Sequence, residues 1–330
     1  MDKNANIFVA GHRGMVGSAI VRKLESEGFS NILTRNRKEL DLLDQGSVIK
    51  FYESTKPDYI FIAAAKVGGI KANNTYRAQF IYENLQIQNN LIHFAYKSGV
   101  KKLLFLGSSC IYPRNASQPM KEEDLLSGKL EPTNEPYAVA KIAGIKMCES
   151  YYHQYDCQFF SLMPTNAYGP NDNYDLETSH ALSALIRKIH EAKVSGTKEV
   201  TVWGSGKALR EFIHVDDIAS ATVFVMGLDF SSLYELGITQ LNVGTGEEIS
   251  IRELAKLISE IVEFSGDLVF DQSMPDGTPR KLVDVSRINQ LGWKHKIDLE
   301  DGLATTYALF VEKCANKNMT ENATFKRQTL

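Results

Sequence analysis

Short apolar runs alternate with longer amphipathic stretches along the first half of the chain. The apolar runs have the length of buried strands, and they cover residues 7–10, 32–34, 59–63, 102–106 and 159–163. The amphipathic stretches repeat apolar residues at helical spacing, at 16–27, 46–53, 80–98 and 137–155. Alternating strands and helices form a parallel sheet through right-handed crossovers. The pattern therefore predicts an α/β fold of the Rossmann type, with a doubly wound parallel sheet.

The pattern becomes irregular after about Tyr168, where Gly, Pro, Asn and Asp are frequent. It resumes with a helical pattern at 180–193, a strand at 200–203 and further short elements as far as Val311. We expect these elements to form a smaller C-terminal α/β lobe. Such a lobe would bind substrate against the carboxyl ends of the sheet strands.

This division predicts two functional parts of the chain. Residues 1–170 would form the cofactor-binding Rossmann domain. Residues 171–330 would mainly form the substrate-binding lobe, with some segments returning to the Rossmann core. The last residues, 316–330, are polar, and we expect them to fray.

The composition of the chain excludes some classes of binding partner. The formal net charge of the 330 residues is −3, so no overall basic field attracts nucleic acid or an anionic membrane. We find neither a signal-peptide pattern nor a long apolar run. The four cysteines show no Cys-x-x-Cys pair and no zinc-like spacing with histidine; they are Cys110, Cys148, Cys157 and Cys314. These features predict a cytoplasmic protein with reduced thiols and no metal site.

A glycine-rich loop directly follows the first predicted strand and precedes the first predicted helix. It reads Gly11-His12-Arg13-Gly14-Met15-Val16-Gly17. Gly11 permits a tight turn, Gly14 lets the backbone approach a pyrophosphate, and Gly17 allows the helix to pack closely on the strand. This context between a strand and a helix favours dinucleotide binding over a structural turn.

The end of the second strand indicates which dinucleotide is bound. NAD sites place an acidic residue there to hold the ribose 2′-hydroxyl, whereas this chain has Arg35 and Arg37. Their guanidinium groups attract a 2′-phosphate, and Arg13 of the glycine loop can add a contact. We therefore expect NADP(H). The alternative is that Arg35 and Arg37 are solvated surface charges.

Tyr137 and Lys141 are four residues apart at the start of a predicted helix, so they share one face. A lysine ammonium beside the phenol would lower the pKa of the tyrosine and allow proton exchange with a carbonyl or alcohol. Ser108, just after the fourth strand, can hydrogen-bond the same substrate oxygen. The alternative is a tyrosine packed by its ring beside a surface lysine. The order of glycine loop, serine, tyrosine and lysine resembles that of the extended short-chain dehydrogenases/reductases.

Longer strings make the resemblance more specific. The strings at 63–70, 107–113, 131–138, 163–166, 203–206, 210–217 and 275–281 resemble the GDP-L-fucose synthases. That resemblance implies conversion of GDP-4-keto-6-deoxy-D-mannose to GDP-L-fucose, with epimerisation at C3 and C5 and reduction of C4 by NADPH. It also implies a homodimer through the predicted helices 80–98 and 137–155.

The residues suit this chemistry. A 4-keto group acidifies the protons on C3 and C5, so one base and one acid can invert both carbons through enolates. Cys110 is a plausible base, and the resemblance makes His180 the acid. Tyr137 would then protonate the C4 oxyanion, with Ser108 and Lys141 in support. As alternatives, Cys110 is a small buried residue and His180 only caps a helix.

The resemblance assigns the remaining contacts. Besides the glycine loop and the two arginines, the cofactor would touch Leu106, Gly107, Ser108, Ser109, Lys141, Pro164, Thr165, Asn166, Ala167 and His180. The nucleotide sugar would touch Lys188, Trp203, Arg210 and Asp276. The alternative for Arg210 is a local ion pair with Glu211.

Two other functions fit the same motifs. One is a different nucleotide-sugar epimerase, dehydratase or reductase on this scaffold. A dehydratase usually has an acidic residue beside the catalytic serine, where this chain has Cys110. The other is a non-catalytic NADP(H)-binding regulator, in which we would expect the Ser–Tyr–Lys set to be broken, and here all three residues are present.

Overall fold

The computed structural model describes residues 1–274 and 276–328, with no side chains described beyond residue 315. A six-stranded sheet, in the order β10-β5-β4-β3-β1-β2, forms the centre of the larger lobe. Its strands are β1 (Ile7–Ala10), β2 (Ile32–Leu33), β3 (Tyr59–Ile62), β4 (Lys102–Leu106), β5 (Gln158–Pro164) and β10 (Gln240–Val243). All neighbouring strands are parallel. The predicted Rossmann-type sheet is confirmed.

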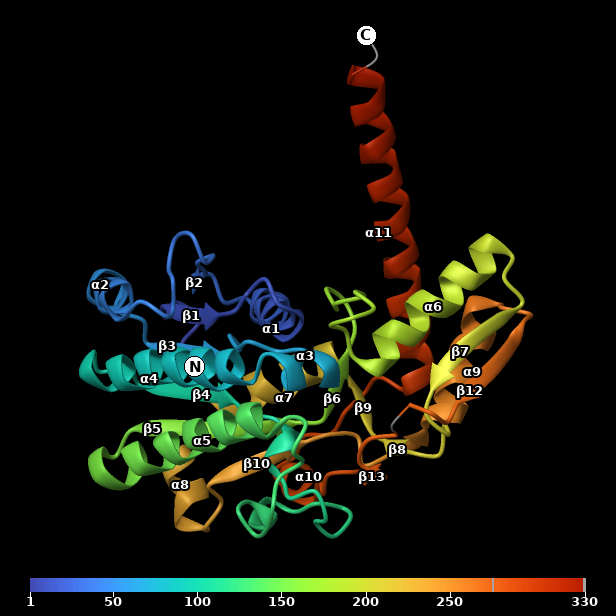
Figure 1. Ribbon diagram of the computed structural model, residues 1–330. Helices are drawn as coiled ribbons and strands as arrows, with labels where there is room; N and C mark the ends of the chain where they lie inside the picture. Colours follow the sequence, from blue (N-terminus) through green and yellow to red (C-terminus); the bar gives the residue numbers. More distant parts are fainter. Residues whose placement is uncertain (275, 329–330) are drawn as a thin grey trace.

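Helices cover both faces of this sheet (Figure 1). One face carries α1 (Met15–Ser26), α7 (Val215–Met226) and α8 (Phe230–Glu235), and the other carries α2 (Gln45–Thr55), α4 (Arg77–Lys97) and α5 (Glu135–Tyr155). Along β1, Ile7 and Val9 pack into the first core, and Phe8 and Ala10 pack into the second. Because both faces are buried, strands such as β1 are continuously apolar, whereas β10 alternates polar and apolar residues although all four are buried.

Strands β2 and β3 lie on opposite sides of β1, so the connection from β1 to β2 and the crossover from β2 to β3 run in opposite directions along the sheet. Chain segments therefore diverge at the carboxyl ends of β1 and β3 and leave a crevice between them. This topological switch point positions the glycine loop, which follows β1.

The second lobe has its own apolar core. It contains α6 (Ala181–Ser195), α9 (Ile251–Val262) and the start of α11 (Leu299–Gln328), packed on paired strands β7 (Glu199–Trp203) and β12 (Asp267–Asp271). Short strands join this lobe to the sheet: β6 (Asn166–Tyr168) with β9 (Phe212–His214), and β8 (Leu209–Arg210) with β11 (Ile249–Ser250) and β13 (Arg280–Lys281). Figure 1 shows α6, α9 and α11 beside β7 and β12, away from the large sheet.

Several segments after residue 171 return to the larger lobe. Helix α7 packs on α1, β10 adds the sixth sheet strand, and α10 (Ser286–Gln290) contacts β10. In the larger lobe, the predicted helix 80–98 begins earlier, at Arg77, and a separate short helix α3 (Ile70–Thr75) precedes it. Two single 3₁₀ turns, η1 (Ser109–Ile111) and η2 (Glu122–Asp124), complete the loops.

Residues 316–328, which we expected to fray, instead continue helix α11, and 329–330 lie outside the described residues. Within the part of the chain that is described, no helix has both the length and the apolar content that a membrane crossing requires.

Candidate active site

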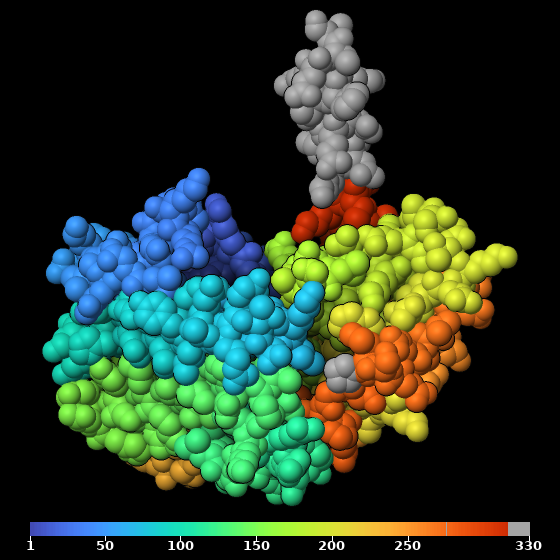
Figure 2. All heavy atoms as spheres, viewed as in Figure 1, coloured from blue at the N-terminus to red at the C-terminus, as the bar shows by residue number. Residues whose placement is uncertain are grey.

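A large cleft, with a volume of about 880 Å³, lies where the two lobes meet. Figure 2 shows the surface hollowed between the first part of the chain and the second lobe. The structure brings all the residues of the predicted site to this cleft: Gly11, His12, Arg13, Gly14, Met15, Val16, Gly17, Arg35, Arg37, Leu106, Gly107, Ser108, Ser109, Cys110, Tyr137, Lys141, Pro164, Thr165, Asn166, Ala167, His180, Lys188, Trp203, Arg210 and Asp276.

The glycine loop fits a pyrophosphate. Gly11 has φ +87°, and a Cβ there would lie 2.7 Å from the backbone nitrogen of Ala64. A Cβ on Gly17 would overlap the carbonyl of Gly11. Gly14 is the N-cap of α1 and supplies no side-chain cap, so N–H groups in the first helical turn remain free to bind an anion. The buried Nδ1 of His12 also has no partner in the structure.

The arginines at the end of β2 are exposed and line the rim of the cleft. Arg35 donates a hydrogen bond to the carbonyl of Thr34 at 2.7 Å. Arg37 has a loose ion pair with Asp41, with 3.9 Å between Nε and Oδ1. A pair this long and exposed is weak, so the guanidinium of Arg37 is available to an incoming phosphate.

Helix α5 carries the tyrosine and lysine. Lys141 is 4% exposed, and its Nζ donates to the carbonyl of Leu106 at 2.7 Å. Its Nζ is 5.7 Å from the centre of the Tyr137 ring. The alternative of a surface lysine is therefore wrong.

The predicted effect of the lysine on the tyrosine is also wrong in this structure. Burial raises the pKa of Tyr137, and Cys110 adds to the rise, while Ser108 acts against it. Burial lowers the pKa of Lys141 to about 7. Burial is the main cause of both shifts, because both groups lose solvent around their charged forms. The phenol consequently remains protonated at neutral pH, which is the state that a proton donor needs.

Cys110 lies in η1, beside Ser108. The backbone N–H of Cys110 donates to the hydroxyl of Ser108 at 3.3 Å, and its Sγ lies 3.3 Å from the Nζ of Lys281. Burial acts to raise the pKa of the thiol, but Lys281 and the hydrogen bond with Ser108 outweigh it, so the pKa is lowered. Cys110 is thus half-buried beside a cation, and the alternative of a small, fully buried residue does not fit its exposure.

His180 is the N-cap residue of α6, but its side chain makes no capping hydrogen bond. The capping alternative is therefore wrong, and the imidazole lines the cleft. Burial lowers the pKa of His180; Asp172 acts against this and Lys281 adds to it. Asp172 is 7% exposed and accepts hydrogen bonds from the hydroxyl of Ser183 and the N–H of Asn173.

Two cations of the second lobe face the cleft. The Nζ of Lys188 lies 5.2 Å from the centre of the Trp203 ring, and Nη2 of Arg210 donates to the carbonyl of Asp276 at 3.2 Å. The predicted alternative, an ion pair between Arg210 and Glu211, does not form. The carboxylate of Glu211 is buried and instead accepts backbone N–H groups, including that of Thr245 at 2.7 Å.

The segment after β5 lines the same cleft as the glycine loop. The N–H of Thr165 donates to the carbonyl of Val243 at 2.9 Å. The side-chain amide of Asn166 donates to the carbonyl of Glu211 at 2.7 Å. These bonds hold the segment between the sheet and the second lobe.

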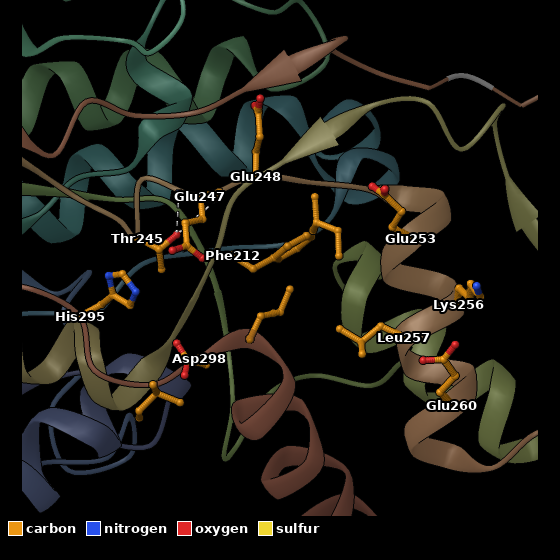
Figure 3. Close-up of a pocket in the computed structure, with 13 residues that line it drawn as sticks. Phe212, Thr245, Glu247, Glu248, Glu253, Lys256, Leu257, Glu260, His295 and Asp298 are labelled. Atoms are coloured by element: carbon orange, nitrogen blue, oxygen red, sulfur yellow. Dashed lines mark hydrogen bonds between the residues drawn. The ribbon is translucent and has the colours of Figure 1, made fainter.

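Charge distinguishes this cleft from a neighbouring cavity. The cavity in Figure 3, of about 510 Å³, lies near α9 and the start of α11. Its charged side chains are mainly carboxylates: Glu247, Glu248, Glu253, Glu260 and Asp298, with Lys256. The larger cleft is lined by more arginines and lysines than carboxylates, and it also has the free helical N–H groups. Anionic ligands are therefore favoured in the larger cleft and disfavoured in the smaller cavity.

Two groups near the reacting centre were missed by the sequence analysis. Lys281 is 171 positions from Cys110, and Asp172 lies in the irregular segment before α6. Lys281 ends one of the strings that resemble the GDP-L-fucose synthases, which was the only available signal. Nothing in the sequence pattern indicates Asp172.

Comparisons with known proteins show the family of the chain. Residues 7–237 match the model of the NAD dependent epimerase/dehydratase family. The chain is 57% identical over 316 residues to GDP-L-fucose synthase 1 of Arabidopsis thaliana, covering 96% of each. It is 56% identical over 309 residues to the GDP-L-fucose synthase of Escherichia coli, covering 93% of this chain and 96% of that one.

Two solved structures share the fold and bind NADP. A GDP-L-fucose synthetase from Naegleria fowleri bound to NADP has a TM-score of 0.86 at 27% identity, covering 96% of each chain. MlghC, a GDP-mannoheptose C4 reductase from Campylobacter jejuni with NADP bound, has a TM-score of 0.88 at 44% identity, covering 94% of this chain and 99% of that one. The chain belongs to the NAD dependent epimerase/dehydratase family and, within it, to the GDP-L-fucose synthase family.

Proposed function

We propose that the protein is an NADPH-dependent enzyme that converts GDP-4-keto-6-deoxy-D-mannose to GDP-L-fucose. The observation that carries this proposal is the meeting of Ser108, Cys110, Tyr137 and His180 in one cleft beside the glycine loop. A simple reductase needs only the serine, tyrosine and lysine. Two epimerisations require an extra base and an extra acid. Cys110, which lies beside a cation, would supply the base, and His180, whose side chain makes no capping hydrogen bond, would supply the acid.

The glycine loop, the free N–H groups of α1 and the arginines at the end of β2 would hold the NADP(H). When bound, NADPH supplies the hydride for C4. Tyr137 is protonated at neutral pH and would donate its proton to the C4 oxygen. Ser108 would hydrogen-bond the same oxygen and orient it.

Cys110 would act on C3 and C5 as a base. Its lowered pKa raises the fraction of thiolate at neutral pH. His180 would deliver a proton from the other face of the ring. The diphosphate of the substrate brings negative charge into the cleft, and this charge favours the imidazolium form that an acid needs.

The substrate would lie between the lobes. Lys188 and Arg210 would bind its diphosphate or sugar, with Trp203 and Asp276 as further contacts. In this arrangement residues 1–170 bind mainly the cofactor, and 171–330 mainly bind the GDP-sugar. We also propose a cytoplasmic location, and a homodimer through α4 and α5, which pack side by side.

The direct experiment is to supply purified protein with GDP-4-keto-6-deoxy-D-mannose and NADPH. We expect the absorbance of NADPH to fall and the product to be GDP-L-fucose, identified by its NMR couplings. A product reduced at C4 but unchanged at C3 and C5 would instead support a C4 reductase, the activity named for the Campylobacter relative MlghC. A Cys110→Ser variant serves as the matched control, since it keeps the Ser–Tyr–Lys set.

A further inference from the structure

Lys281 is a cation that none of the assigned roles uses. Its Nζ lies 3.3 Å from the Sγ of Cys110. Among the described side chains, those of residues 1–274 and 276–315, no carboxylate lies within ion-pair distance of this ammonium. The adjacent Arg280 differs, since its Nε lies 2.8 Å from a carboxylate oxygen of Glu248. Two neighbouring cations on β13 therefore have different partners, a carboxylate and a thiol.

The backbone around Lys281 is fixed by buried groups. Strand β13 pairs with β8, where Lys281 is opposite Arg210. The next N–H, of Leu282, donates to the side-chain amide oxygen of Gln118 at 2.8 Å. The N–H of Val283 donates to the carboxylate of Glu211 at 3.0 Å, and Glu211 is fully buried. These bonds tie β13 to the loop that follows Cys110 and to the base of the second lobe, so the ammonium is held beside the thiol.

We propose that Lys281 is a positioning residue for the epimerisations, which holds Cys110 as the thiolate that removes protons from C3 and C5. This inference rests on the proposed function. Other groups near the thiol are the hydroxyls of Ser108 and Tyr137, and Lys281 also lies close enough to His180 to act on its imidazole. Among these groups Lys281 is the cationic side chain in contact with the sulfur. An ammonium at this distance favours the thiolate over the thiol.

Each inversion moves one proton to Cys110 and one proton from His180. The thiolate of Cys110 takes the proton from the carbon, and the electron pair of the broken C–H bond moves into the enolate. A proton from the imidazolium of His180 then enters at the opposite face. The thiol and the neutral imidazole return to their starting states by proton exchange with solvent, and Lys281 keeps its proton throughout.

The test measures the ionisation of Cys110 in the whole protein without substrate. The rate of alkylation by iodoacetamide is followed against pH, and the peptide that contains Cys110 is quantified by mass spectrometry. Lys281→Met should move the midpoint upward by about one pH unit or more, which slows alkylation at pH 7 about tenfold. Lys281→Gln repeats the test with a second neutral side chain. Lys281→Arg should restore the midpoint to near that of the wild type.

Arg280→Met is the matched control, since it removes a neighbouring cation that binds Glu248, and we expect it to leave the midpoint unchanged. With substrate in D₂O, Lys281→Met should lower the rate of deuterium entry at C3 and C5 about tenfold with little change in KM. An unchanged alkylation midpoint in folded Lys281→Met and Lys281→Gln would overturn the inference. Because alkylation needs no substrate, this outcome is separate from a failure of the proposed function, which the product assay detects.

Discussion

At the scale of single residues, burial determines the protonation of the reducing site. Lys141 of α5 is buried against the end of β4, where its Nζ donates a hydrogen bond to the carbonyl of Leu106. Burial therefore lowers its pKa to about 7. The same burial keeps the phenol of Tyr137 protonated. The site is set to donate a proton from the tyrosine in the free protein.

The lowered pKa of Lys141 predicts a pH-dependent cost in stability. At pH 7 the folded protein binds fewer protons at Lys141 than the unfolded chain, whose lysine pKa is near 10.5. Unfolding takes up protons, so stability should rise with pH from about 7 towards 10.5. Removing the amine with Lys141→Met should therefore stabilise the cofactor-free protein at pH 7, by roughly a few kcal/mol.

Thermal unfolding of both proteins between pH 7 and 10 measures this effect. The difference in Tm should shrink as the pH rises, while Lys97→Met, at the exposed end of α4, should behave like the wild type. A Tm difference that is constant over this range would contradict the assigned cause.

Sequence reasoning identified Ser108, Tyr137 and Lys141 because their order and spacing lie within local motifs. Cys110 was identified from its position two residues after Ser108, and His180 was assigned by the family resemblance. The protonation states were not predictable, since they depend on how far tertiary packing excludes water from each group. Lys281 was missed as a partner of Cys110 because their contact exists only after β13 pairs with β8.

At the scale of elements, the turn from β1 into α1 shapes the cofactor site. Gly17 lies against the carbonyl of Gly11, and the helix approaches the strand more closely than any side chain would allow. The N–H groups of α1 reach the cleft only because of this approach. The sequence predicted this element well, since the glycine spacing specifies a turn with few alternatives.

Gly17→Ala should separate α1 from β1. The added methyl group meets backbone atoms that cannot move aside, so we expect a loss of about 1–3 kcal/mol in stability and at least about tenfold weaker NADPH binding. Gly46→Ala is the control: its Cβ would meet only the side chain of Asp44, 3.8 Å away, in the first turn of α2. That variant should bind NADPH normally. Unfolding curves and NADPH titration measure the two effects, and normal binding by Gly17→Ala would count against the proposed pyrophosphate site.

Other elements were less predictable. Strands β8, β11 and β13 have two residues each, too few to produce an alternating pattern. The break between α3 and α4 at Tyr76 was missed because no glycine or proline marks it. These short elements join the two lobes, and their positions depend on tertiary hydrogen bonds such as those of Glu211.

At the scale of the whole molecule, the two lobes share one cleft because the chain passes between them several times. The sequence predicted both lobes and some return of the chain to the core. It did not show which segments return, since β10 has only four residues, of which Gln240 and Asn242 are polar, and so gives no signal of a buried strand. The cleft itself follows from the switch point of the sheet and the placement of the second lobe above it.

The exposed residues of α4 and α5 allow a test of the proposed homodimer. Tyr82 is 64% exposed, Val139 is 39% exposed and Tyr155 is 43% exposed. Light scattering after size exclusion should give twice the mass of one chain. Tyr82→Arg should shift the population towards monomers, because a charge would be buried in the interface. Lys121→Ala, on an exposed loop away from both helices, should remain dimeric. A wild-type protein with the mass of one chain would exclude this proposal.

The central claim is that one cleft performs both inversions and the reduction. The most direct measurement is the conversion of GDP-4-keto-6-deoxy-D-mannose with NADPH in D₂O, followed by NMR of the product. Our account predicts GDP-L-fucose with deuterium at C3 and C5, and loss of most of this deuterium incorporation in Cys110→Ser. A product reduced at C4 that retains hydrogen and the original configuration at C3 and C5 would contradict it.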